Sequence, residues 1–86
     1  MRPARSPLHA AFGIAMRERR TALKLSQDKL AEMAELDATY LSGIEHGYRN
    51  PGLLNVLTLA DCLEIPASQL VRRAEEILRE GGVSPP

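Results

Sequence analysis

The stretch LDATYLSGIEHGYRNP, residues 36–51, decides the fold because it describes one short helix with a recognisable signal at each end. Asp37 is a typical N-cap residue, and Gly47 is the residue type that most often ends a helix. Leu41 and Ile44 lie three residues apart, so they share one apolar face. The opposite face is small and uncharged, since it carries Ala38, Thr39, Ser42 and Gly43. Such a bare face predicts close contact with a partner surface.

Helical spacing of apolar residues predicts four more helices, which together give an all-α fold. The five predicted helices cover about 7–24, 27–34, 38–46, 53–63 and 66–80. Ser6 and Ser26 precede the first two helices as N-caps. Only three residues separate the second and third helices, which must therefore cross steeply, as in a helix-turn-helix.

The composition limits the chain to a small domain of packed helices. It has 86 residues, of which 44% are hydrophobic, and its aromatic residues are Phe12, Tyr40 and Tyr48. No apolar run approaches the roughly 20 residues of a membrane span, so no membrane partner is expected. A single cysteine, Cys62, excludes an internal disulfide and favours a cytoplasmic location.

The domain organisation follows from where helical spacing starts and stops. Residues 1–6 show no periodicity and are expected to form a flexible N-terminal arm. Residues 7–80 are predicted to form one domain, because the chain contains no internal repeat and no linker. Residues 81–86 begin with two glycines and end with two prolines, so a flexible tail is expected.

Charge is unevenly distributed along the chain although the formal net charge is zero. Residues 1–24 hold six cationic side chains against one carboxylate, a balance of +5. Residues 25–48 hold one lysine against five carboxylates, a balance of −4. Because local charge governs contact with phosphates, a neutral total does not exclude a nucleic-acid partner.

A resemblance extends over residues 23–70, which contain a Leu-Ser-Gln start, a Ser-x-Ile-Glu-x-Gly motif and Arg-Asn-Pro. This pattern resembles the Cro/cI-type, or Xre-like, helix-turn-helix family of transcription regulators. Residues 36–51 are especially similar to the controller proteins of restriction–modification systems, which are compact dimers without a ligand domain. The resemblance implies a five-helix lambda-repressor-like domain whose third helix enters the major groove of double-stranded DNA.

The family pattern also implies how the third helix works. It places Ala38, Thr39, Ser42 and Gly43 at the bases and pairs Arg20 with Glu45 as a structural ion pair. Thr39 can offer its hydroxyl to a base edge and its methyl to a thymine. Controller proteins often have Arg at the position of Ala38, and its absence removes a guanine contact worth about 1–3 kcal/mol. We therefore expect specificity to depend on few base contacts, on DNA shape and on half-site spacing.

Phosphate contacts are expected around the third helix. The resemblance assigns Gln27, at the start of the second helix, to a phosphate. Side chains beside or after the third helix complete the predicted set with two cations of the first helix: Tyr40, Tyr48, Arg49, Asn50, Arg17 and Lys24. Asp37 is expected to act as a cap, and His46 as a helix C-terminal residue rather than a pH switch.

Surplus apolar residues in the last two helices predict a homodimer. Leu53, Val56, Ala60 and Leu63 suffice for the core, which leaves Leu54 and Leu57. A second stripe is predicted on the last helix at Val71, Ala74, Ile77 and Leu78. Two-fold pairing would set two recognition helices roughly 34 Å apart. The alternative is a monomer whose last helix folds back over the first.

Other functions were weighed against DNA-binding regulation. The sequence shows no nucleophile–base pair, phosphate-binding glycine loop or metal cluster, so no enzyme, cofactor or metal is predicted. One alternative is an antitoxin whose last helix binds a toxin, and another is a phage or plasmid repressor. Asp28, Glu32 and Glu35 form an acidic surface that an activator could present to RNA polymerase.

Overall fold

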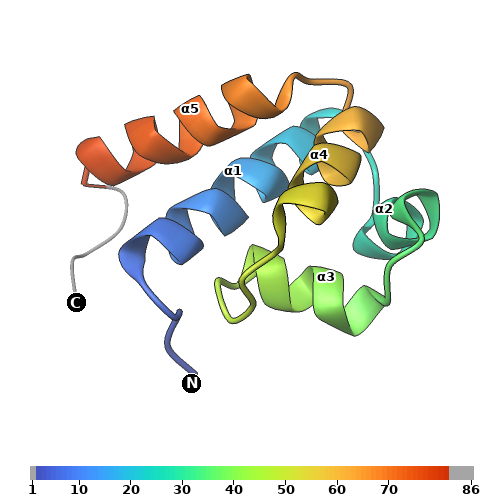
Figure 1. Cartoon of the computed structure of the whole chain (residues 1–86), viewed down its shortest axis with the longest axis horizontal. Coiled ribbons are helices and arrows are strands. Elements are labelled where there is room, and N and C mark those ends of the chain that lie inside the picture. Colours follow the sequence, from blue (N-terminus) through green and yellow to red (C-terminus); the bar gives the residue numbers. More distant parts are fainter. Residues whose placement is uncertain (1, 82–86) are drawn as a thin grey trace.

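Five helices and no strand make up residues 2–81, the part of the chain that the computed structural model describes. They are α1 (Pro7–Ala22), α2 (Gln27–Ala34), α3 (Ala38–Glu45), α4 (Leu53–Cys62) and α5 (Ala67–Arg79). In Figure 1, α5 lies along one side of α1, while α3 lies on the other side and α2 closes one end. The predicted all-α fold and its five helices are confirmed.

Side-chain caps define where the first three helices begin. Ser6 Oγ accepts from the His9 N–H at 3.1 Å, and Ser26 Oγ accepts from the Lys29 N–H at 3.0 Å. Asp37 Oδ1 accepts from the N–H groups of Thr39 and Tyr40 at 2.8 and 3.1 Å. Each cap satisfies N–H groups that have no acceptor within the helix. The carboxylate of Asp37 is therefore occupied at the start of α3.

Four helices end in the same backbone motif, in which one residue takes a left-handed conformation. Lys24, Glu35 and Glu64 have φ values of 59°, 57° and 57°, and Gly47 has φ 78°. The following residue donates its N–H back to a carbonyl five residues earlier, as from Leu36 to Ala31 at 2.9 Å. Lys24 ends α1 two residues earlier than predicted, because its left-handed conformation breaks the helix.

The core lies between α1 and the other helices. Its largest fully buried side chains are Met16, Leu30, Leu41, Ile44, Leu59, Leu63 and Leu70. Gly13 allows α1 and α3 to approach closely: a Cβ atom there would lie 2.6 Å from the Ile44 carbonyl oxygen and would also meet the Glu45 carbonyl. A methyl group at this position would push the two helices apart.

Three apolar residues differ from their predicted places. Ala74 and Ile77, predicted as surplus surface, are 1% and 4% exposed, because the stripe that continues from Leu70 faces α1. Their assignment to a dimer interface is therefore wrong. Leu53, predicted in the core, is 76% exposed because it begins α4 ahead of the positions that face inward. The exposed apolar surface of α4 and α5 instead consists of Leu53, Leu54, Leu57, Val71 and Leu78.

The segment before α1 lies against the turn that follows α3. Arg5 donates its N–H to the Gly47 carbonyl at 2.8 Å, and the Arg2 guanidinium lies 4.6 Å from the centre of the Tyr48 ring. Met1 and residues 82–86, which were assigned to the arm and the tail, lie outside the described residues. Within residues 2–81, no helix is both long and apolar enough to cross a membrane.

Candidate nucleic-acid interface

A buried ion pair fixes α3 against α1. Arg20 Nε and Nη2 donate to the two carboxylate oxygens of Glu45 at 2.7 and 3.0 Å, which is a bidentate arrangement. The side chains are only 11% and 2% exposed. Arg20 also donates to the Leu25 carbonyl at 2.7 Å, and so holds the turn that leads into α2. Arg20 and Glu45 were paired in the sequence analysis, and the structure brings them together.

Glu45 has a second partner that the sequence analysis missed. Gln27 Nε2 donates to Glu45 Oε1 at 2.9 Å, so the half-buried amide is held against α3. One carboxylate therefore connects α1, α2 and α3. The sequence analysis assigned Gln27 only to a phosphate. Gln27 is the first residue of α2 and lies beside the end of α3, and this position could have indicated the contact with Glu45. This network sets the orientation of α3 in the helix-turn-helix.

The side of α3 assigned to bases is less open than predicted. Thr39 is exposed, whereas Ala38 and Ser42 are half-buried. Gly43 is buried, so its place on the exposed face is wrong. The stem of Arg49 covers it: a Cβ atom on Gly43 would lie 2.7 Å from Arg49 Cγ. Gly43 thus gives room to Arg49 rather than to a partner surface.

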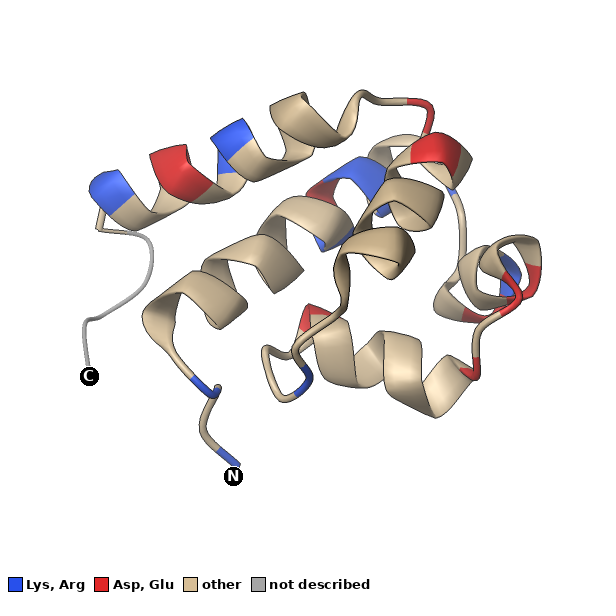
Figure 2. Cartoon of the chain, in the orientation of Figure 1, with Lys and Arg blue, Asp and Glu red and all other residues tan. Residues whose placement is uncertain are grey.

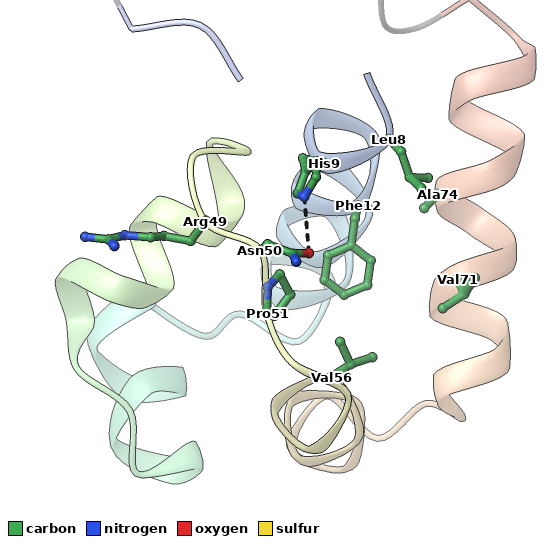
Figure 3. A pocket seen from close by; sticks show the side chains of 9 residues that line it. All are labelled: Leu8, His9, Phe12, Arg49, Asn50, Pro51, Val56, Val71 and Ala74. Atoms are coloured by element: carbon green, nitrogen blue, oxygen red, sulfur yellow. Dashed lines mark hydrogen bonds between the residues drawn. The ribbon is translucent and has the colours of Figure 1, made fainter. Parts of the chain in front are cut away.

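Arg49 and Asn50 leave the loop after α3 in different directions, as Figure 3 shows. Arg49 extends past α3 and is exposed, while Asn50 turns toward α1. Asn50 Oδ1 accepts from His9 Nε2 at 3.1 Å, and His9 Nδ1 lies 2.6 Å from Ser6 Oγ. This chain of hydrogen bonds ties the loop to the start of α1. Asn50 is thus bonded within the fold, whereas the cationic side chain of Arg49 is exposed beside α3.

The other residues predicted to contact phosphates lie around α3, and some of them have partners within the protein. Arg17 shares a hollow with Gln27 between α1, α2 and α3. Lys24 is exposed in the turn after α1 and does not line that hollow. The Tyr40 hydroxyl accepts from Asn55 Nδ2 at 3.2 Å. Tyr48 stacks on His46, with ring centres 5.5 Å apart.

The cations near α3 lie around the helix rather than on it. Figure 2 shows cations in the segment before α1 and in the loop after α3, and carboxylates at the two ends of α3. Asp37 is used as the cap and Glu45 is paired, so neither carboxylate opposes a polyanion freely. The described residues contain no group of His, Cys, Asp and Glu suited to a metal ion. This geometry suits a helix that approaches bases between two phosphate-binding flanks.

Comparison with known proteins defines the class. Residues 16–70, more than half of the chain, match the family described as Helix-turn-helix. The chain therefore belongs to the helix-turn-helix family and is a DNA-binding transcription regulator. Its fold, predicted from the resemblance to Xre-like regulators, is confirmed.

Individual relatives narrow the comparison. The chain is 36% identical over 66 residues to the control protein C.MunI of Mycoplasma sp, covering 76% of this chain and 89% of the relative. The solved structure of the restriction–modification controller protein C.AhdI from Aeromonas hydrophila is 45% identical, with a TM-score of 0.71 over 72% of this chain and 94% of that one. The hypothetical transcription factor NHTF from Neisseria is 34% identical, with a TM-score of 0.76 over 86% and 83%.

Proposed function

We propose that this regulator is a controller protein of a restriction–modification system that binds a pseudo-palindromic operator as a homodimer in the cytoplasm. The observation that carries the proposal is the locked α3, whose uncharged face is flanked by cations and whose buried carboxylate joins three helices. The similarity to C.MunI and C.AhdI supports the controller type.

The proposed base contacts come from the first half of α3. Thr39 is exposed there and offers both a hydroxyl and a methyl group, and Ala38 and Ser42 lie beside it. Since none of these side chains can form a bidentate contact with guanine, the proposal includes recognition of DNA shape. Gly43 is left out of the base-reading set because Arg49 covers it.

The proposed phosphate contacts lie on both sides of α3. Arg49 is the main one, because its exposed guanidinium passes over Gly43 along the helix. Arg17, Lys24, Tyr40, Tyr48, Asn50 and the backbone of Gln27 complete the set. Such contacts fix the position of the protein on the duplex and make binding depend on salt.

The exposed apolar surface of α4 and α5 supports a dimer. Leu54 and Leu57 are 75% and 49% exposed, and Val71 is 42% exposed. Val71 also borders an apolar hollow of about 230 Å³, whose lining includes Leu8, Phe12 and Val56 (Figure 3). Apolar surface of this kind on a small domain favours pairing with a second copy. A carboxylate-rich side of α2, with Asp28, Glu32 and Glu35 exposed, would then be available to RNA polymerase.

Selection of duplexes from a random pool tests this function. We expect an enriched site with two half-sites about 10 base pairs apart, centre to centre, and a dimer by sedimentation at micromolar concentration. A monomer that enriches no sequence at low salt would refute the proposal. Neighbouring methyltransferase and endonuclease genes would support the controller type, whereas co-purification of a second, different chain would favour an antitoxin.

A further inference from the structure

A polar hollow lies where α1, α2 and α3 meet, and two of its side chains are exposed. The hollow is lined by Arg17, Arg20, Gln27, Glu45 and His46. Arg20 and Glu45 neutralise each other, and Gln27 is bonded to Glu45. Arg17 and His46 remain exposed at the rim. The start of α2 opens on the same hollow, and its Ser26 cap accepts only from Lys29, the third N–H of the helix.

The hydrogen bonding of His46 determines which ring nitrogen faces outward. His46 Nδ1 lies 2.8 Å from the Ser42 carbonyl oxygen. A carbonyl oxygen only accepts, so Nδ1 carries a hydrogen and donates it. In the neutral ring Nε2 is then an acceptor, which cannot bind a phosphate oxygen. When the ring is protonated, Nε2 also becomes a donor, and the side chain becomes a cation at the C-terminal end of α3.

We propose that protonated His46 is a phosphate ligand of the DNA complex and makes operator affinity depend on pH. The inference rests on the proposed function, because it assigns a further contact to the same interface. The phosphate would be held by His46 Nε2, by Arg17 and by the first N–H groups of α2. Tyr48 stacks on the His46 ring and keeps it in place.

Charged groups from α1, from α3 and from the segment before α1 lie around His46. Arg17 and Arg20 face it from α1, and Arg2 lies over Tyr48 from the segment before α1. Glu45 is the carboxylate facing it, and this group is already paired with Arg20. A phosphate oxygen at Nε2 is bound only by the charged ring, so affinity for DNA falls as the pH rises through the range in which histidine loses its charge.

The test measures affinity for the selected duplex at pH 6.0 and pH 7.4, at several salt concentrations. We expect the wild-type dimer to bind about tenfold more tightly at pH 6.0. Each protomer contributes one exposed contact between His46 and a phosphate, and each contact is expected to raise the affinity about threefold. The slope of log K against log salt should be steeper at pH 6.0 by about 0.9 per protomer. His46→Gln should remove both differences, and circular dichroism would verify that this variant is folded.

Two further variants complete the experiment. His9→Gln removes the other histidine of the chain and should keep the pH dependence of the wild type. His46→Arg should bind tightly at both pH values, since arginine stays charged. A pH-independent wild type, or a pH dependence that survives in His46→Gln, would overturn the role of His46 while leaving the operator site intact. Failure of every variant to bind any duplex would instead overturn the proposed function.

Discussion

At the scale of single residues, the interface depends on Arg49 lying over a glycine. Gly43 is buried in α3 because the Arg49 stem covers it, and a Cβ atom would lie 2.7 Å from Arg49 Cγ. Sequence reasoning predicted Arg49 as a phosphate contact but placed Gly43 at the bases. Its burial depends on the path of the loop after α3, which no local pattern in α3 specifies.

Substituting Gly43 should therefore weaken DNA binding through Arg49. We expect Gly43→Ala to displace the Arg49 side chain and to reduce affinity for all duplexes by about threefold to tenfold, with a smaller salt slope. Arg49→Ala should have a similar effect. Titrations with a fluorescent duplex would measure both.

The double variant separates the two explanations for Gly43. If Gly43 acts through Arg49, adding Gly43→Ala to Arg49→Ala should cause little further loss, a non-additive result. Additive losses would show that Gly43 contacts DNA independently of Arg49. The cap at Asp37, in contrast, follows from residue type and position, and the Arg20–Glu45 pair was predicted from the resemblance to the helix-turn-helix family.

At the scale of the helices, three helix ends hold a residue other than glycine in a strained backbone conformation. Lys24, Glu35 and Glu64 hold left-handed conformations that glycine adopts more easily. We expect Lys24→Gly, Glu35→Gly and Glu64→Gly each to raise the free energy of unfolding by about 0.5–1 kcal/mol in urea titrations. Gly47→Ala is the converse substitution and should lower the free energy of unfolding, because the added Cβ atom would lie 3.0 Å from the Ala10 nitrogen. A loss of stability in the glycine variants would contradict this account.

A charged cluster links α1 to α5. Arg73 donates to both oxygens of Glu18 at 2.9 and 3.1 Å, and this hydrogen bonding lowers the pKa of the Glu18 carboxyl below its ordinary value of 4.5. A carboxyl with a lowered pKa stabilises the fold above its unfolded pKa, and the contribution is lost as the pH falls through the folded pKa.

Glu18→Gln should thus destabilise the protein at neutral pH only. Because both side chains are nearly half exposed, we expect a loss below about 1 kcal/mol at pH 7 that disappears as the pH falls below 4.5 and through the lowered pKa of Glu18. Thermal unfolding over this pH range would measure it, with Glu75→Gln, an exposed carboxylate on α5, as the control. An equal effect of Glu18→Gln at all pH values would rule out the ion pair as its cause.

At the scale of the whole molecule, the size of the chain explains why the proposed operator would need a dimer. The chain measures 32 Å in its longest direction, and its single eight-residue α3 can enter only one major groove. Half-sites one turn apart, roughly 34 Å, therefore need two copies. Helical spacing predicted the surplus apolar residues, but which of them face outward depends on how α5 lies along α1. That packing was not deducible from periodicity, so Ala74 and Ile77 were misplaced.

A charge on the exposed apolar surface should separate the two copies. We expect Leu57→Glu to give a folded monomer by sedimentation and to reduce operator affinity by about a hundredfold, since the second half-site is lost. Met33→Glu changes a comparably exposed side chain on α2 and should leave the dimer unchanged. If Leu57→Glu remained a dimer, the interface would have to lie elsewhere than on α4.

The contact between the first residues and the turn after α3 bears on how the protein is labelled. Arg5 is bonded to Gly47, and Arg2 covers Tyr48, so any tag fused ahead of them emerges beside the recognition helix. Purification handles and fluorophores at that end would compete with the duplex for space. A label carried beyond Arg79 starts from α5, on the side of α1 away from α3, and leaves the groove-facing surface accessible (Figure 1).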